Sequence, residues 1–310
     1  MTPEDMKQAF PNAIMNVGDN DERVVVLVGD IGHFALKPFA EKCPGRYYNI
    51  GILEPTIVSM AAGLSAKGFY PVVHTITPFI TERSLEQVKL DFCYQGLGGN
   101  LICVGSAFDY STLGSTHHAY NDMATIGSIP GTEIIYPASP FELEELFKQT
   151  YNNGNVTYMR MARHPHGVEF DKIEFGKGIM VRKGSDITLI ATGPQLKTVL
   201  DAAEQLDKNG VNSEVLYFHT VKPFDSDLVV ESVSKTKAAL VVEEHISIGG
   251  LEHYVRMSLN NRFKYILKSL CIPQEFLRHY GTYDEHCEAM GFTVENVCSL
   301  SNKILVEKLL

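Results

Sequence analysis

Several features that mark particular classes of protein are absent from this sequence. It has no tryptophan, no run of lysines and arginines, and no apolar stretch near the ~20 residues that span a bilayer. Lysine and arginine number 27 against 37 aspartates and glutamates, which gives a formal net charge of −10. A negative chain without a basic run is a poor ligand for nucleic acid or for an anionic membrane, so we expect neither as a partner.

The cysteines form no recognisable framework. Six are scattered through the chain without a C-x-x-C pair. This spacing indicates reduced thiols rather than disulfides or a zinc site, and we expect no metal ligands from this chain. The first ten residues, MTPEDMKQAF, are acidic and polar, whereas a secretory signal is basic and then apolar. We therefore expect a cytoplasmic protein.

The composition is that of a soluble globular protein, with 45% apolar and 21% charged residues among 310. Short β-branched runs alternate with amphipathic stretches. Strands are expected at 23–29, 71–75, 100–105, 133–136, 186–191, 211–218 and 238–243, and helices at 55–67, 84–94, 139–151, 195–209, 226–234 and 250–260. Such alternation favours parallel α/β sheets.

A change of composition divides the chain. Residues 160–184 are rich in charge, glycine and histidine, and we interpret them as an irregular linker. We therefore expect an α/β protein with two parallel-sheet domains, the first over residues 1–175 including the linker and the second over residues 176–310.

Glu54 is the first candidate for chemistry. It follows an apolar run and precedes the helix that begins with Pro55. This is the carboxyl end of a strand, where open α/β sheets place their sites. The alternative is a carboxylate that only stabilises the helix N-terminus, and the local pattern alone favours that structural role.

A histidine pair, His117 and His118, follows Gly114-Ser115-Thr116 in an expected loop. Paired imidazoles can stabilise an oxyanion or transfer protons, or they can simply form hydrogen bonds at the surface. Adjacent histidines without a nearby cysteine or H-x-x-x-H pattern make a poor metal site.

Other candidates also have two interpretations. Arg160 and Arg163 suit bidentate contacts to phosphate or carboxylate, whereas solvated linker charges are the simpler explanation. Phe79 could stack on a ligand ring, although phenylalanines more often pack in a core.

Taken in order, these segments resemble the C-terminal half of a thiamine-diphosphate-dependent transketolase. The resemblance implies a pyrimidine-binding domain followed by a transketolase C-terminal domain. It also implies transfer of a two-carbon ketol unit from a ketose (phosphate) donor to an aldose. The matching segments are Arg46–Glu54, Ala61–Ser65, Gly68–Pro71, Thr75–Gln87, Gly114–His118, Pro137–Ser139, Arg160–Pro165, Thr188–Gly193, Lys222–Asp225, Val241–His245 and Gly249–Leu251.

The resemblance implies a role for each candidate. Glu54 would bind N1′ of the cofactor's aminopyrimidine and thereby activate the cofactor, and His117 would contact the donor oxygen. Phe79, or Ile80 one residue later, would stack on the pyrimidine. The resemblance further implies cofactor contacts from Ile52 and Asp30, and substrate contacts from His117, His118, Arg163, Arg160 and His33.

Two departures from the family pattern change the expectation. In transketolases, the aspartate of a D-G-P-T-H motif recognises a substrate hydroxyl, and Leu113 stands at that position here. We therefore expect a different donor or acceptor, for example one that is deoxygenated, branched or attached to a nucleotide.

The Gly-Asp-Gly motif that binds diphosphate and Mg²⁺, together with a later Asn, is also absent. We expect a split transketolase whose N-terminal subunit supplies that site, assembled as a heterotetramer with two copies of each chain. The apolar segments 57–64 and 85–92 would suit its interface.

Two alternatives remain open. One is the beta chain of the first component of a 2-oxo acid dehydrogenase, which shares this architecture. The other is a non-catalytic regulatory subunit of the same fold, although Glu54 and His117 are both retained. A dinucleotide-binding protein is disfavoured, because no G-x-G-x-x-G follows the first strand of either domain.

Overall fold

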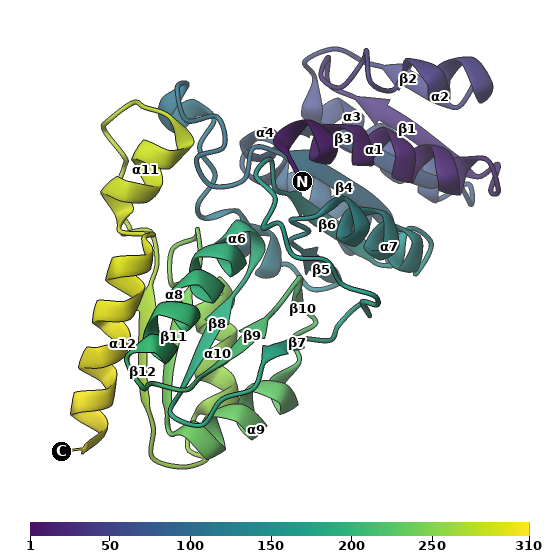
Figure 1. Cartoon of the computed structure of the whole chain (residues 1–310). Coiled ribbons are helices and arrows are strands. Elements are labelled where there is room, and N and C mark those ends of the chain that lie inside the picture. Colours follow the sequence, from purple (N-terminus) through teal and green to yellow (C-terminus); the bar gives the residue numbers. More distant parts are fainter. Residues whose placement is uncertain (310) are drawn as a thin grey trace.

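The computed structural model describes residues 1–309, which form two α/β units (Figure 1). The first sheet has seven strands in the order β10-β5-β6-β4-β3-β1-β2, all parallel except β10. Its inner strands are buried and apolar, as a parallel sheet covered on both faces requires. The strands are β1 (Val24–Val28), β2 (Tyr47–Asn49), β3 (Tyr70–Ile76), β4 (Gly99–Val104), β5 (Thr132–Ile135), β6 (Val156–Met161) and β10 (Thr220–Lys222).

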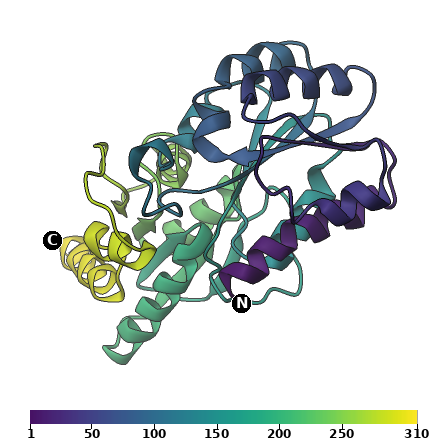
Figure 2. The same ribbon diagram turned by 90° about the horizontal axis from the view of Figure 1, so that it is seen from above.

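Helices cover both faces of this sheet, and Figure 2 shows α1 and α3 on opposite sides of it. Phe10 of α1 packs with Phe147 of α7 in one apolar core, while Ile57 of α3 and Ile126 of α6 lie in the other. The helices of this unit are α1 (Pro3–Gly18), α2 (Lys37–Lys42), α3 (Glu54–Ser65), α4 (Thr77–Thr81), α5 (Leu85–Gln87), η1 (Val88–Cys93), η2 (Gly114–Thr116), α6 (Asp122–Gly127) and α7 (Pro140–Thr150).

The second sheet has five strands in the order β12-β11-β8-β9-β7, with only β7 antiparallel. Helices α8 and α12 cover one face of it, and α9 and α10 cover the other. The elements are β7 (Ile179–Arg182), β8 (Ile187–Ala191), η3 (Gly193–Gln195), α8 (Leu196–Lys208), β9 (Ser213–Tyr217), α9 (Ser226–Thr236), β11 (Ala238–Val242), α10 (Leu251–Leu259), β12 (Ile266–Leu270), α11 (Tyr283–Met290) and α12 (Val294–Leu309).

The two units exchange elements. Strand β10 follows β9 of the second sheet but pairs antiparallel with β5 of the first. Nζ of Lys222 on β10 donates to the carbonyls of Gly127 and Ile129 at 2.9 and 3.2 Å. In the other direction, Phe108 of the first unit is buried in an apolar core of the second. The loop after β4 is therefore held between the two units.

The predicted α/β fold with parallel sheets is confirmed, but some local predictions are not. Helix α1 was not predicted, although Thr2 and Asp5 form a capping box around its first turn. Residues 160–184 are not irregular throughout. They contain the end of β6, a buried inner strand, and all of β7, which pairs with β9. The domain boundary at residue 175 lies between these strands and stays a prediction. Within residues 1–309, no helix combines the length and apolarity needed to cross a membrane.

Candidate active site

Glu54 begins α3, in the turn that follows β2. Its side chain is 1% exposed, and Oε2 accepts a hydrogen bond from Nη1 of Arg83 at 2.7 Å. Oε1 is buried and has no hydrogen-bond partner among residues 1–309. A buried acceptor is costly when unpaired, so Oε1 is a suitable position to receive an N–H group from a ligand.

Phe79 lies on the short helix α4, which follows β3, and Arg83 connects it to this carboxylate. Its ring is partly exposed, and the guanidinium of Arg83 lies 4.3 Å from the ring centroid. Ile80, the other residue considered for stacking, is fully buried in the core. Of the two, only Phe79 presents its side chain to the site.

His117 completes this group from the loop after β4. Its ring lies 5.5 Å from that of Phe79 and 5.7 Å from that of Tyr110, measured between centroids. Oγ1 of Thr116 lies 2.8 Å from Nδ1 of His117 and orients the imidazole. Because Nδ1 is engaged and the ring is partly exposed, Nε2 is the atom available to a substrate. The structure thus brings Glu54, Phe79 and His117 together.

Arg163 lies nearby, after the end of β6. Its side chain is exposed, and its backbone N–H donates to Oδ2 of Asp109 at 3.1 Å. It lines a cavity of about 360 Å³ together with Tyr110, His74 and Phe10. Because Tyr110 also contacts His117, the cavity adjoins the histidine. A cation at this point suits an anionic substituent of a substrate.

Asp30, His33 and Ile52 lie at the edge of the first sheet. Asp30 is exposed with φ of 57°, and its Oδ1 accepts from the side chain of Asn49 at 3.1 Å. Nδ1 of His33 lies 2.9 Å from the hydroxyl of Tyr47. Ile52 is 65% exposed, two residues before Glu54. None of the three contacts the Glu54, Phe79 and His117 side chains through a hydrogen bond or ring contact in the described part of the chain.

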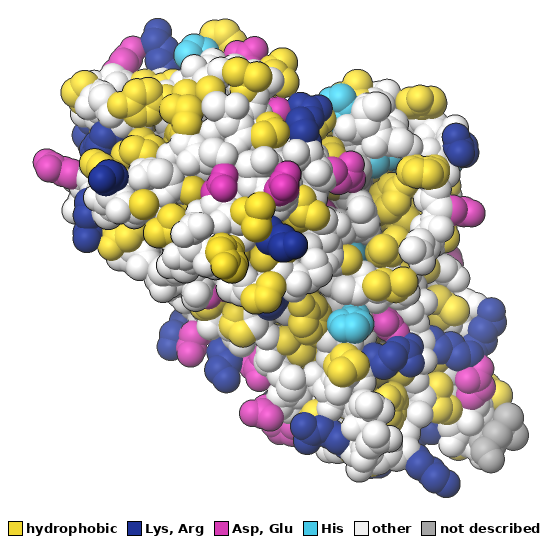
Figure 3. Space-filling view, turned by 180° about the vertical axis from the view of Figure 1, so that it is seen from behind, with side chains coloured by type: hydrophobic (Ala, Val, Ile, Leu, Met, Phe, Trp, Pro, Cys, Tyr) yellow, Lys and Arg dark blue, Asp and Glu magenta, His cyan; other side chains and the backbone are white. Residues whose placement is uncertain are grey.

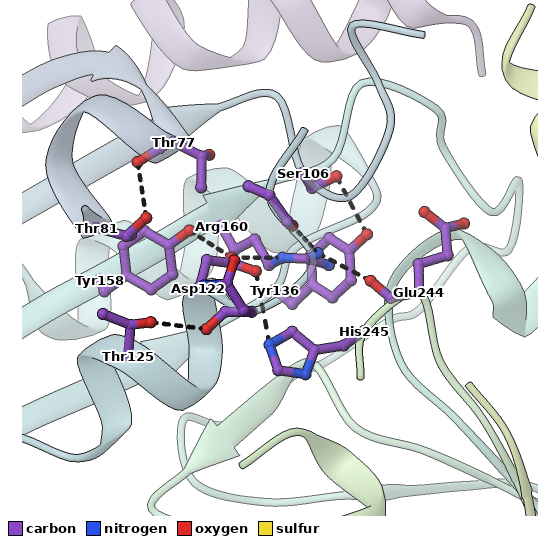
Figure 4. A network of polar contacts seen from close by, with 12 residues as sticks. Thr77, Thr81, Ser106, Asp122, Thr125, Tyr136, Tyr158, Arg160, Glu244 and His245 are labelled. Atoms are coloured by element: carbon purple, nitrogen blue, oxygen red, sulfur yellow. Dashed lines mark hydrogen bonds and ion pairs between the residues drawn. The ribbon is translucent and has the colours of Figure 1, made fainter. Parts of the chain in front are cut away.

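Arg160 has a different position from the one expected. It lies on β6 and is fully buried, with Nε 2.7 Å from Oδ2 of Asp122 (Figure 4). Nη2 donates to the carbonyls of Ala119 and Glu244, both at 3.0 Å. Arg160 therefore joins the two units from within. The expected substrate contact does not fit this position, because no part of the side chain reaches the surface.

His118 also points away from its neighbour His117. It is 3% exposed and lies edge-on to His286 of α11, with the ring centroids 5.4 Å apart. Burial, followed by the nearby His286, lowers the pKa of His118 to about 4, so the ring is neutral at pH 7. His118 lines a cavity together with Glu82 and Tyr120, and its expected substrate contact stays a prediction.

Arg83 and Tyr110 were not among the predicted site residues. Arg83 follows Phe79 by four residues, a spacing that places both on one side of a helical turn. That spacing was the available signal for Arg83. No comparable signal exists for Tyr110, since its place depends on the irregular loop after β4.

Exposed apolar side chains lie close to the site. In the segments expected at a subunit interface, Ile57 and Phe92 are buried in the core, whereas Met60 and Leu90 are 42% and 41% exposed. Leu53, next to Glu54, is 55% exposed. Figure 3 shows apolar side chains over this unit on the face opposite to that of Figure 1. Apolar surface of this kind is typical of an interaction site.

Comparison with known protein families matches both units. Residues 3–166 match the family described as transketolase, pyrimidine binding domain, and residues 176–297 match the transketolase, C-terminal domain. The chain is 29% identical over 307 residues to the 6-deoxy-6-sulfo-D-fructose transketolase subunit of Clostridium sp. (strain MSTE9), covering 98% of this chain and 95% of that protein.

One further relative and one solved structure also align with nearly the whole chain. An apulose-4-phosphate transketolase subunit of Phocaeicola vulgatus is 29% identical, with 94% of this chain and 95% of that protein covered. A solved structure described as a split gene transketolase, inactive beta4 tetramer, superposes with a TM-score of 0.89 at 27% identity, covering 97% of this chain and 98% of that one. The chain therefore belongs to the thiamine-diphosphate-dependent transketolase family, with the pyrimidine-binding domain followed by the transketolase C-terminal domain.

Proposed function

We propose that this chain supplies the pyrimidine-side half of a shared active site, which transfers a two-carbon ketol unit from a ketose (phosphate) to an aldose. Activity requires an N-terminal subunit that holds the diphosphate and Mg²⁺. The observation that carries this proposal is the grouping of three side chains. Glu54 is buried, and its Oε1 has no hydrogen-bond partner within residues 1–309. Arg83 contacts both Glu54 and the ring of Phe79, and that ring lies 5.5 Å from the ring of His117; both rings are partly exposed.

The residues present fit the aminopyrimidine of thiamine diphosphate. Oε1 of Glu54 is a buried acceptor without a hydrogen-bond partner in the part of the chain that the structure describes, which suits a protonated ring nitrogen. The ring of Phe79 offers an apolar face at the same site. When bound, thiamine diphosphate supplies the electron sink that allows a carbon–carbon bond beside a carbonyl to break.

The chain's own residues then have distinct tasks. Oε1 of Glu54 shares a proton with N1′ of the aminopyrimidine, while Arg83 keeps Oε2 occupied and the carboxylate oriented. Nε2 of His117 faces the donor oxygen, where it stabilises developing negative charge or transfers a proton. The Thr116 contact at Nδ1 holds the imidazole in that orientation.

Arg163 and Leu113 have proposed roles in substrate binding and substrate choice. We propose that Arg163 binds an anionic group, such as a sugar phosphate, at the mouth of the adjoining cavity. Leu113 is 47% exposed, directly before the turn η2 that leads to His117, and its side chain cannot hydrogen-bond a hydroxyl. We therefore propose a donor or acceptor other than the standard pentose phosphates. The two transketolase subunits compared above are named for two different sugars.

The assembly we propose is a heterotetramer in the cytoplasm, with two copies of each chain. Two relatives that align over nearly their whole length are named as transketolase subunits, which supports a partner chain. The exposed apolar side chains beside Glu54 support an interface at the site itself. We assign Mg²⁺ and the diphosphate to the partner because this sequence has no Gly-Asp-Gly.

The experiment is purification of the tagged chain from its native extract, followed by mass spectrometry and ketol-transfer assays of the complex. We expect an equimolar second chain with Gly-Asp-Gly and a later Asn, and transfer between a ketose and an aldose. Glu54→Gln should abolish transfer, whereas the exposed control Glu22→Gln should not.

Three outcomes would contradict the proposal. Recovery of this chain alone as the active species would exclude the shared site. Pyruvate-driven reduction of an artificial electron acceptor would instead indicate the 2-oxo acid dehydrogenase component. Cofactor binding by the complex without turnover of any ketose would indicate a regulatory subunit.

A further inference from the structure

We propose that His286 of the second unit positions the His117 loop, defined here as residues 105–120, and thereby controls ketol transfer without touching substrate. The inference rests on the proposed function, because it assigns the histidine of that loop to the reaction. It gives the C-terminal domain a part in catalysis that packing alone would not require.

The His117 loop is anchored in the second unit. Ala107 and Phe108, at its start, lie in the apolar core formed by β8, β9, α8 and α12. The backbone N–H of Ala119 donates to the carbonyl of Ala107 at 2.7 Å, which closes the base of the loop. The two ends of the loop therefore lie together at the junction between the two units.

His286 provides a polar anchor for the middle of the loop. It lies on α11, fully buried, and stacks on Phe108 with the ring centroids 5.2 Å apart. Nε2 lies 3.1 Å from the backbone oxygen of Ser111. Because a carbonyl can only accept, Nε2 carries the proton and donates it. Burial lowers the pKa of His286, and the bond to Ser111 acts against that shift.

Tyr280 supports the turn that presents His117. Gly114 has φ of 72°, and an added Cβ there would lie 2.8 Å from the ring of Tyr280. The carbonyl of Gly114 accepts the backbone N–H groups of His117 and His118 at 2.9 and 3.1 Å. The turn thus lies directly against a side chain of the second unit.

These contacts act on the backbone of the loop rather than on the imidazole. Apart from the short turn η2, the loop forms no regular helix or strand, so its conformation depends on its contacts with both units, including those with His286 and Tyr280. Reacting groups lose rate steeply when displaced, by up to about 100-fold for 1 Å. Loss of the Ser111 bond should therefore lower turnover while leaving Glu54, which lies on α3, unchanged.

The test compares His286→Leu with His286→Gln in the assembled complex. Gln carries an Nε2–H that can donate to Ser111, whereas Leu has no donor. We expect the Leu variant to lose at least tenfold in kcat with the donor KM changed less than twofold. Gln should restore most of kcat. The control is His253→Leu, an exposed histidine on α10, which should keep wild-type kinetics.

A second measurement separates positioning from folding. Under the proposed function, the exchange rate of the C2 proton of bound thiamine diphosphate depends on Glu54. This rate should therefore stay within twofold of wild type in His286→Leu. If that variant proves unstable, Tyr280→Ala replaces it, because Tyr280 is 71% exposed and its loss should lower kcat without lowering Tm.

Two results would overturn the proposal. One is a folded His286→Leu complex, or the Tyr280→Ala complex in its place, with wild-type kcat. The other is a parallel fall of kcat, C2 exchange and Tm, with no recovery in His286→Gln. A wild-type complex without any ketol transfer would instead refute the proposed function, and this inference with it.

Discussion

Nη1 of Arg83 lies 2.7 Å from Oε2 of Glu54, and this ion pair orders the candidate site. The same guanidinium lies 4.3 Å from the ring centroid of Phe79. One side chain therefore contacts both groups that we propose bind the aminopyrimidine. It also leaves Oε1 of Glu54 as the remaining acceptor.

Replacement of Arg83 by methionine should weaken both the fold and the cofactor site. Glu54 would remain buried without its cation, although half of Arg83 is exposed and solvent screens the pair. We therefore expect a loss of about 1 kcal/mol in unfolding free energy, measured with urea, and weaker thiamine diphosphate binding by calorimetry. Lys37→Met breaks an exposed pair with Glu41 and should change neither quantity. Unchanged binding in Arg83→Met would contradict this role.

Phe79 and Ile80 should respond differently to alanine. Phe79 is partly exposed at the site, so Phe79→Ala should weaken thiamine diphosphate binding by about three- to tenfold with little change in stability. Ile80 is fully buried, so Ile80→Ala should lose about 2–4 kcal/mol of unfolding free energy. Titration calorimetry and urea unfolding measure the two effects. The reverse pattern would assign the stacking position to Ile80.

Arg163 and Arg160 form a second pair with opposite expectations. Arg163→Met should raise the KM for an anionic sugar about tenfold with a smaller effect on kcat, because we propose that its exposed guanidinium binds the anion. Arg160→Met should instead unfold or destabilise the chain by about 3–5 kcal/mol, since Asp122 would stay buried without its cation. Steady-state kinetics and thermal unfolding distinguish the two. A folded Arg160→Met complex with only a raised KM would instead support the substrate contact that the sequence predicted for Arg160.

Asp109 makes the stability of the chain depend on pH. Burial, and then the charge of Glu244, raises the pKa of its carboxyl from 3.8 to about 7. The folded chain thus retains a proton that the unfolded chain loses near pH 4, and the contribution to stability declines as the pH rises to 7. Asp109→Asn keeps an oxygen for the N–H groups of Ser106 and Arg163.

We expect the Asn variant to match wild type at pH 4 and to exceed it by about 2–4 kcal/mol at pH 8. Urea unfolding at several pH values measures the difference. A constant difference across this range would show that Asp109 does not titrate there.

The sheets were predictable because their strands are local apolar runs. Val24–Val28 is buried throughout, and such a run indicates an inner parallel strand without reference to the rest of the chain. Ser139 likewise indicated a helix start, and its side chain accepts from the N–H of Glu142. Helix α1 was predictable in the same way from its capping box, but its acidic start was considered only as evidence against a signal peptide.

The site was predictable only in part, because its environment depends on distant residues. The roles of Glu54 and His117 came from the family resemblance, whereas their local patterns favoured structure at least as much as function. The burial of Arg160 depends on Asp122 and on a carbonyl of the second unit. The contact between His286 and Ser111 joins residues 175 positions apart, which no local pattern reveals.

The most direct test of the central claim is exchange of the C2 proton of thiamine diphosphate in complexes containing wild-type or Glu54→Gln chain. Gln nearly preserves the shape of the side chain but cannot hold the proton shared with N1′. We predict rapid exchange in the wild-type complex and exchange near the rate of free cofactor in the variant, with equal Tm for both. Wild-type exchange in the Glu54→Gln complex would contradict the assignment of Glu54.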